Sequence, residues 1–203
     1  MGVSLSTYGN PAPTGRFLPN SGVKVFTEEG EEVQPGSGVT GMVAVAGTIP
    51  LGYFHDDEKT ARTFREFGGV RYSIPGDWAT IEADGMITLL GRGSQCINTG
   101  GEKVFPEEVE EVLKIHPSVE DALVFGLPDE RFGQRIAAVV SLAPDAEPIE
   151  DPKAIVDAVR ERISSYKLPR DVVVVDTVPR AANGKADYPR ARELFESASS
   201  PRQ

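Results

Sequence analysis

A few positions of the sequence combine side chains that can handle polar or charged ligands with glycines that let a backbone approach closely. Asp77 follows a glycine, Arg92 ends a β-rich run, and Lys185 follows an Asn-Gly dipeptide. A carboxylate can accept hydrogen bonds from a diol, a guanidinium offers a planar fork of donors, and an ammonium offsets the repulsion between two anions. Gly100 and Gly101 are paired, as in places where a backbone approaches another group closely.

Each of these positions also has a plainer interpretation. An aspartate beside a glycine most often caps backbone N–H groups in a turn. An arginine at the end of a strand is commonly a solvated charge, and a lysine after Asn-Gly is an ordinary exposed turn residue. Paired glycines inside a strand usually mark a bulge. Residue types alone therefore leave a ligand site and a set of turn residues both open.

The histidines and the cysteine do not form a recognisable site. His55 and His116 are the only histidines, and Cys96 is the only cysteine. Two histidines so far apart in the sequence do not suggest a metal site or a catalytic triad, so no metal ligand is expected in this chain. A lone cysteine cannot form an internal disulfide, which favours a cytoplasmic location.

Length and charge narrow the classes of protein and partner. A chain of 203 residues that is 39% hydrophobic and 26% charged is long enough for two small domains. The net charge is −10, with 11 acids and 7 bases in residues 1–93 and 20 acids and 14 bases in residues 94–203. Nucleic acid is therefore not an expected partner. No apolar run reaches about 18 residues, so no transmembrane segment is expected.

Residues 1–93 have the pattern of a small antiparallel β unit. Residues 1–22 are rich in Pro, Gly and Asn and predict an irregular segment. Short β-rich runs follow from Val23, and Asp84-Gly85 between two such runs predicts a hairpin, because this dipeptide tolerates the positive φ of a tight turn. The expected fold of this part is a β-barrel-like subdomain.

Residues 94–203 alternate strands with helices. Pro106 fits the first position of a helix with Val109, Val112 and Leu113 on one face, and Pro117 ends it. A second helix is expected after Asp151-Pro152 and a third over residues 189–197, with strands at 122–129, 135–143 and 171–178. The order β-α-β-β-α-β-α predicts an α+β domain with a three-stranded central sheet and flanking helices.

Five stretches, taken together and in order, resemble the adenylate-forming enzymes, a family that includes acyl-CoA synthetases, luciferases and the adenylation domains of peptide synthetases. The stretches are TGMVAVAGTIPLGYF, RYSIPGDWATIEADGMITLLGR, GRGSQCINTGGEKVFPEEVEEVL, SSYKLPR and VPRAANGK. The resemblance covers roughly residues 16–197. Within it, the sequence INTGGEKVFPEEVE is most similar to bacterial fatty-acid and steroid-side-chain CoA ligases. It implies an enzyme that joins a carboxylate to ATP as an acyl-adenylate and then passes the acyl group to the thiol of CoA.

The resemblance also implies roles for single residues. Asp77 and Arg92 would contact the ribose of ATP, and Lys103 is a possible contact for its phosphates. Lys185 would be the catalytic residue, placed between the substrate carboxylate and the α-phosphate during adenylation. The paired glycines Gly100 and Gly101 would line the tunnel for the pantetheine arm of CoA.

Two departures from the family pattern bear on these roles. Pro75 replaces a threonine that commonly precedes Gly76-Asp77, so the role of that hydroxyl is absent. Ser94 occupies the family's hinge position, which is often Asp or Lys. Because a hinge needs only a residue whose φ and ψ can change without a clash, serine is expected to alter the rate of rotation rather than to abolish it.

The sequence lacks the glycine-rich phosphate loop of the family. The resemblance implies that the Thr-Glu motif whose glutamate holds Mg²⁺ lies in a missing N-terminal region. We therefore expect a C-terminal piece of an acyl-CoA synthetase, inactive alone, with residues 1–93 as the last β subdomain of a large N-terminal domain and residues 94–203 as a mobile lid. The missing N-terminal domain would be its partner and would supply the Mg²⁺ ligand. The alternative is a stand-alone, non-catalytic module that binds a nucleotide or CoA. A lysine acetyltransferase acting on Lys185 is a further expected partner, because acetylation would remove the ammonium charge.

Overall fold

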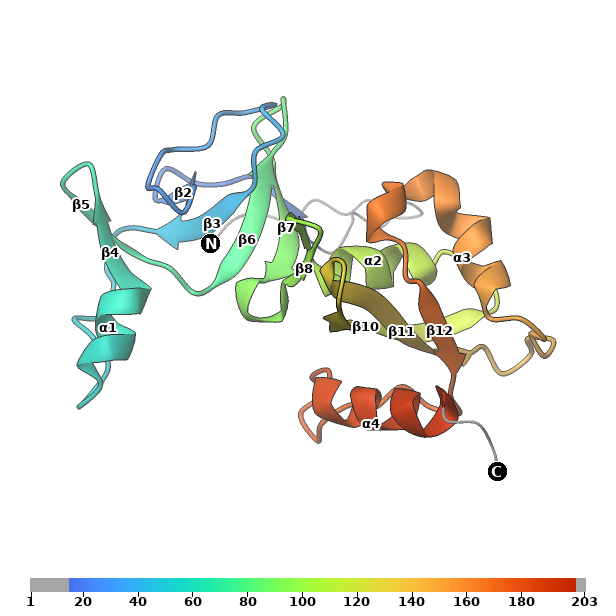
Figure 1. Ribbon diagram of the computed structural model, residues 1–203. Helices are drawn as coiled ribbons and strands as arrows, with labels where there is room; N and C mark the ends of the chain where they lie inside the picture. The colour runs from blue at the N-terminus through green and yellow to red at the C-terminus, as the bar shows by residue number, and fades with distance from the viewer. Residues whose placement is uncertain (1–14, 200–203) are drawn as a thin grey trace. The chain divides into compact units, whose positions relative to one another are not determined.

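The computed structural model describes residues 15–199, which fall into two compact units that divide between Ser94 and Gln95 (Figure 1). Each unit has its own β-sheet and its own hydrophobic clusters. The expected α+β class is confirmed. The expected irregular segment over residues 1–22 lies partly outside the described residues, and within them Arg16–Phe17 forms the short strand β1.

The first unit is built on an antiparallel sheet. Its strands pair in the order β1-β7-β6-β3-β5-β4, and β2 adds to β3. The elements after β1 are β2 Val23–Phe26, β3 Gly41–Val45, α1 Asp57–Thr63, β4 Phe64–Phe67, β5 Val70–Ser73, β6 Asp77–Ile81 and β7 Ile87–Arg92. Among residues 15–199 no pairing closes this sheet, so the barrel-like form expected from the sequence is corrected to an open sheet.

The strands of the first unit bury alternate apolar residues, as their sequence pattern predicts. Val25, Val43 and Ile87 lie in one hydrophobic cluster, while Phe26 and Ala44 lie in another. Successive side chains of a strand point to opposite faces, so neighbouring residues enter different clusters. The Asp84-Gly85 hairpin is confirmed, with Gly85 at a φ of +80° between β6 and β7.

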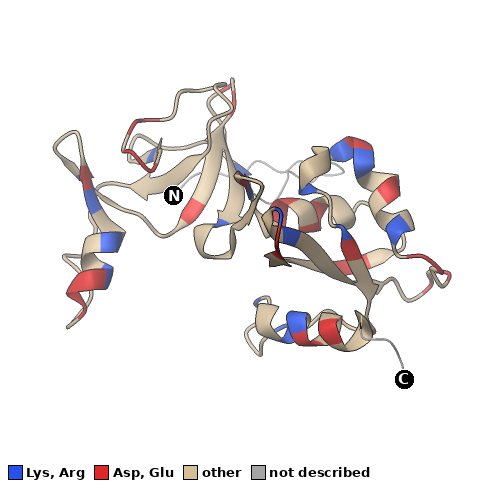
Figure 2. Ribbon diagram, viewed as in Figure 1, with Lys and Arg blue, Asp and Glu red and all other residues tan. Residues whose placement is uncertain are grey.

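Helix α1 and the β4–β5 hairpin were not predicted. Asp56 caps the helix, since its Oδ1 accepts a hydrogen bond from the Lys59 N–H at 2.9 Å. Figure 2 shows acidic residues in the first turn of α1 and a basic residue near its end, the arrangement that the helix dipole favours. A helix of seven residues, about two turns, with few apolar side chains shows little hydrophobic periodicity, which explains why the sequence pattern missed it.

The second unit places helices on both faces of a five-stranded sheet. Its elements are β8 Ile97–Thr99, β9 Glu102–Val104, α2 Pro106–Leu113, β10 Val119–Asp129, β11 Gly133–Leu142, α3 Lys153–Val159, β12 Asp171–Val174 and α4 Tyr188–Ser199. β10 pairs with β11 in an antiparallel manner and β12 pairs with β11 in parallel, which gives the expected three central strands. The β8–β9 hairpin extends this sheet through the pair Gly133–Thr99.

Two separate clusters show how the layers of the second unit pack. Val109 of α2 and Ile155 of α3 pack with Val124 on one face of the sheet. Phe195 of α4 packs with Leu123 and Phe125 on the other face. Neighbouring residues of β10 therefore serve opposite layers, and α2 and α3 lie across the sheet from α4 (Figure 1). None of the helices within residues 15–199 has the length and apolar character needed to cross a bilayer.

Candidate functional site

Asp77 and Arg92 meet at one end of the β6–β7 hairpin. They are paired residues of the two strands, and Arg92 Nε lies 2.8 Å from Asp77 Oδ1. A second guanidinium nitrogen of Arg92 donates to the Pro75 carbonyl at 3.1 Å. Both side chains keep solvent access, with 58% of Arg92 and 32% of Asp77 exposed. The pair thus presents a carboxylate and a fork of donors side by side. The sequence alone could not establish that these two groups are adjacent.

Glycines close the backbone around this pair. Gly76 has a φ of +97°, and its carbonyl accepts a hydrogen bond from the Gly93 N–H at 3.0 Å. A Cβ atom on Gly93 would lie 2.5 Å from Nε1 of Trp78, so the chain needs glycine at that position. These contacts fix the strand ends that carry Asp77 and Arg92.

Gly100 and Gly101 form the two-residue turn of the β8–β9 hairpin rather than a bulge within a strand. Both have positive φ, +61° and +91°, as a type I′ turn requires. The Gly100 N–H donates to the Phe132 carbonyl at 2.9 Å, and a Cβ atom on Gly100 would touch the Phe132 ring at 3.3 Å. Nothing lies within 4 Å of a Cβ atom added at Gly101.

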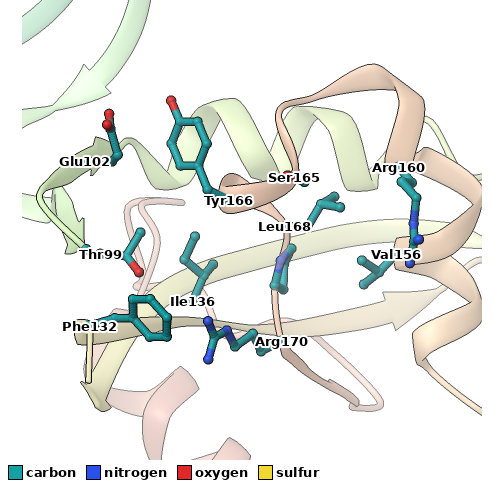
Figure 3. Close-up of a pocket in the computed structure, with 12 residues that line it drawn as sticks. Thr99, Glu102, Phe132, Ile136, Val156, Arg160, Ser165, Tyr166, Leu168 and Arg170 are labelled. Atoms are coloured by element: carbon teal, nitrogen blue, oxygen red, sulfur yellow. The ribbon is translucent and has the colours of Figure 1, made fainter. Parts of the chain in front are cut away.

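A pocket of about 380 Å³ lies beside this turn (Figure 3). Thr99, Phe132 and Tyr166 line it together with the guanidinium groups of Arg160 and Arg170. The Arg170 guanidinium stacks over the Phe132 ring, 4.4 Å from its centroid. A pocket with an aromatic wall and two guanidinium groups can accept an anionic or a planar ligand.

The segment that carries Tyr166 and Arg170 is tied to helix α2. Lys167 Nζ contacts both carboxylate oxygens of Glu108 at 2.7 Å, and the two side chains are only 18% and 28% exposed. This partly buried ion pair links the SSYKLPR stretch to the helix that follows the glycine turn. Lys103 pairs with Asn98 in the β8–β9 hairpin and is half-buried, while Ser94 is exposed at the end of the first unit.

Lys185 lies in a tight exposed turn. Gly184 has a φ of +78°, and its N–H donates to the Ala181 carbonyl at 2.8 Å. The Ala181 N–H in turn donates to the Lys185 carbonyl at 2.8 Å, while the Lys185 N–H donates to Asn183 Oδ1 at 3.1 Å. The Lys185 side chain is exposed, and within residues 15–199 its amine makes no ion pair.

The flanks of this turn are held to the edge strand β10. On one side, Arg180 Nη2 lies 2.7 Å from both carboxylate oxygens of Asp121, and its Nε donates to Asp121 Oδ2 at 3.0 Å. On the other side, the Tyr188 hydroxyl donates to Glu110 Oε1 at 3.3 Å. The same Glu110 oxygen accepts the Val124 N–H of β10 at 2.9 Å.

Glu110 is a buried carboxyl, with 7% of the residue exposed. Burial raises its pKa to about 7, and the nearby Glu107 charge adds to this, while the Val124 N–H and the charges of Arg180 and Lys114 oppose it. The pKa of Tyr188 is also raised, first by burial and then by the carboxylates of Glu110 and Glu107. The hydroxyl therefore remains a donor to Glu110 throughout the neutral range.

The sequence interpretation did not single out Glu110, Tyr188 or the Asp121–Arg180 pair. A signal for Glu110 does exist in the sequence. The buried face of α2 contains Pro106, Val109, Glu110 and Leu113, which follow helical spacing, so a glutamate falls within the apolar stripe. The contacts of Tyr188 and of the Asp121–Arg180 pair depend on which strand forms the edge of the sheet. No local sequence pattern indicates which strand that is.

Comparison with known proteins supports the resemblance. Residues 108–185 match the AMP-binding enzyme C-terminal domain. A medium/long-chain-fatty-acid and 3-oxocholest-4-en-26-oate CoA ligase of Mycobacterium marinum is 50% identical over 198 residues, 97% of this chain. A 3-oxocholest-4-en-26-oate CoA ligase of Rhodococcus rhodochrous is 55% identical over 169 residues, 83% of this chain. The chain matches the C-terminal portion of these CoA ligases. It spans 35% and 30% of their respective lengths.

Two solved structures share the fold of this chain over about a third of their own length. ATP-bound MatB from Rhodopseudomonas palustris is 30% identical with a TM-score of 0.72, over 94% of this chain and 36% of that one. The amide bond synthetase McbA from Marinactinospora thermotolerans is 32% identical with a TM-score of 0.75, over 89% of this chain and 36% of that one. The matched C-terminal domain ends at Lys185, the residue at the tip of the tethered turn.

Proposed function

We propose that this chain is the C-terminal part of an AMP-forming acyl-CoA ligase that activates fatty or other hydrophobic carboxylic acids. The observation that carries the proposal is the exposed Lys185 amine, held on a tethered turn within residues that match the AMP-binding enzyme C-terminal domain. The relatives' names support the substrate class, because they act on medium- or long-chain fatty acids and on a steroid acid. In this proposal the chain alone is inactive.

The proposed reaction has two steps. In the first, a carboxylate oxygen attacks the α-phosphorus of ATP, and the bond to pyrophosphate breaks. Lys185 reduces the repulsion between the two anions and stabilises the charge that develops as they meet. In the second, the thiol sulfur of CoA attacks the acyl carbon, AMP leaves, and the thiol proton passes to solvent.

Other residues have binding roles in this proposal. Asp77 accepts hydrogen bonds from the ribose hydroxyls of ATP, and Arg92 orients that carboxylate and donates to the nucleotide. Gly100 and Gly101 leave room for the pantetheine arm, since neither carries a side chain. The adjacent pocket with Arg160 and Arg170 suits the anionic part of CoA. Lys103 is a weaker candidate for the phosphates of ATP, and Ser94 is the proposed hinge between the half-reactions.

Three further parts of the proposal concern the Mg²⁺ ion, the location of the ligase and the modification of Lys185. The Mg²⁺ ion that accompanies ATP is assigned to residues outside this chain, on the N-terminal domain that residues 1–93 would complete. The ligase is placed in the cytoplasm, in keeping with the single cysteine of this chain. An acetyltransferase acting on the exposed Lys185 would stop adenylation, and mass spectra of the native protein that always show an unmodified Lys185 would contradict this.

The decisive experiment separates the two half-reactions in the ligase that contains this chain. We expect Lys185→Ala to reduce carboxylate-dependent pyrophosphate exchange by roughly 10²- to 10³-fold, the loss typical of a removed electrostatic contact in a transition state. Thioester formation from a pre-made acyl-adenylate should survive, because that step does not bring two anions together. Lys153→Ala, an exposed lysine on α3, is the control. Equal loss of both half-reactions would refute the assignment of Lys185.

A further inference from the structure

The segment 180–188 is held at one end by strand β10 and at the other by Glu110 of α2, while its tip carries the exposed residue Lys185. Arg180 binds Asp121 near the start of β10 through three contacts of 2.7 to 3.0 Å. Tyr188 binds Glu110, and Glu110 binds the backbone of Val124 on the same strand. One end of the segment is thus tied to β10 directly and the other through Glu110, although they lie eight residues apart in the sequence.

Glu110 has an unusual place in the layers of this unit. It belongs to α2, on one face of the sheet, whereas Tyr188 begins α4, on the opposite face. β10 is an edge strand, so its outward N–H groups have no neighbouring strand to accept them. The carboxyl of Glu110 accepts the Val124 N–H at this edge and also the Tyr188 hydroxyl, which links the two helical layers around the rim of the sheet.

We propose that Glu110, Tyr188 and the Asp121–Arg180 pair are positioning residues for Lys185, and that they tether the turn at its base while leaving the amine free to enter a reaction site. The proposal rests on the assignment of Lys185 as the adenylation cation. A buried carboxylate costs stability unless its oxygens are hydrogen-bonded, and Glu110 Oε1 accepts both the Val124 N–H and the Tyr188 hydroxyl. None of these four residues touches substrate in the proposal.

The two tethers differ in strength. The bidentate Asp121–Arg180 pair has short, charge-assisted contacts, which are the stronger kind. The Tyr188–Glu110 contact of 3.3 Å is long for a hydroxyl donor, although its acceptor is a buried carboxyl. Loss of the arginine fork should therefore loosen the turn more than loss of the tyrosine hydroxyl.

Hydrogen exchange on the full chain tests the tether without any need for activity. Tyr188→Phe deletes only the hydroxyl, and Arg180→Lys keeps the charge but loses the fork. We expect the amides of Ala181 and Gly184 to exchange about threefold faster in Tyr188→Phe and about tenfold faster in Arg180→Lys, as loss of one hydrogen bond or of a bidentate pair predicts. Tyr53→Phe is the control, and amides of the β10–β11 ladder should keep their rates. Unchanged exchange at Ala181 and Gly184 in both variants would overturn the proposal.

The second readout is the split between half-reactions in the ligase that contains this chain. We expect kcat for pyrophosphate exchange to fall about tenfold in Arg180→Lys while KM for ATP changes less than twofold and thioester formation from pre-made adenylate is retained. Glu110→Gln, which keeps an oxygen acceptor, should be milder than Glu110→Ala. Equal loss of both half-reactions would indicate mere unfolding and would refute positioning. If Lys185→Ala itself left pyrophosphate exchange intact, the proposed function would fail. The hydrogen-exchange rates of Ala181 and Gly184 would still show whether the four residues tether the turn.

Discussion

Two exposed turns of the second unit, one at Gly100-Gly101 and one at Lys185, have similar backbones but different side chains and anchoring contacts. Both contain glycine at positive φ and both close with backbone hydrogen bonds. The Gly100-Gly101 turn joins the sheet next to Gly133, where β11 follows β10, while the Lys185 turn is anchored at Asp121, near the opposite end of β10. Asp121 and Asp129 are eight positions apart along β10, about 26 Å at the usual rise per residue.

The difference between the turns lies in their side chains. The glycine turn offers none, and its hairpin is held by strand pairing and by one hydrogen bond to Phe132. The Lys185 turn offers one charged side chain and is tied down by charged and polar groups on both flanks. A turn that must let a ligand pass needs only a fixed backbone. A turn that must place a charged side chain also needs flanking residues that are held in position. The next predictions test this contrast.

The largest effect is expected at Glu110, on the Lys185 side. Its pKa is about 7 in the folded chain and 4.5 ordinarily, so the folded state holds a proton that the unfolded state has lost between these pH values. Stability from this group is therefore fully present below about pH 4.5 and is lost as the pH rises through 7, by about 3 kcal/mol. Urea unfolding at pH 4.5 and pH 8 measures it.

Glu110→Gln removes this titration. The free energy of unfolding of wild type should fall from pH 4.5 to pH 8 by about 3 kcal/mol more than that of Glu110→Gln. Glu111→Gln, on the exposed side of the same helix, is the matched control and should show no such trend. A difference between Glu110→Gln and wild type that stays constant with pH would contradict the argument from burial.

A smaller effect is expected at the glycine turn. Gly101→Ala should cost about 1 kcal/mol of stability, because a side chain is strained at its φ of +91° even though the surroundings are open. Thioester formation should slow while pyrophosphate exchange persists, the reverse of the pattern for Lys185→Ala. Gly85→Ala has similar strain in the other hairpin and is the control. If the thioester step were as fast in Gly101→Ala as in Gly85→Ala, the proposed role of Gly101 in lining the tunnel for the pantetheine arm would be refuted.

The smallest effect is expected at Asn183. Its side-chain oxygen accepts the Lys185 N–H at 3.1 Å in an exposed turn, so Asn183→Ala removes one hydrogen bond that water can replace. We expect pyrophosphate exchange to fall about two- to threefold, less than for Arg180→Lys. Ser197→Ala, which removes an exposed hydrogen bond in α4, is the comparison. A larger loss at Asn183 than at Arg180 would mean that the turn is fixed from within rather than from its base.

The sequence by itself determined the α+β class, most strands and helices of the second unit, and the resemblance to adenylate-forming enzymes. Local rules sufficed there, because helix periodicity, first-turn proline and Asp-Gly turns act over a few residues. Pro106 begins α2 and Asp84-Gly85 forms a hairpin turn as the pattern predicts. The roles of Lys185, Asp77 and the other site residues remain predictions that the experiments above address.

Only the tertiary structure decided which residues support the site. The glycine pair became a hairpin turn because Ile97–Thr99 and Glu102–Val104 pair with each other, a choice that the sequence left open. Glu110 and Tyr188 are 78 residues apart, and Asp121 and Arg180 are 59 apart. Their contacts depend on β10 forming the sheet edge with helices on both faces, since an edge strand has outward backbone groups that side chains must satisfy.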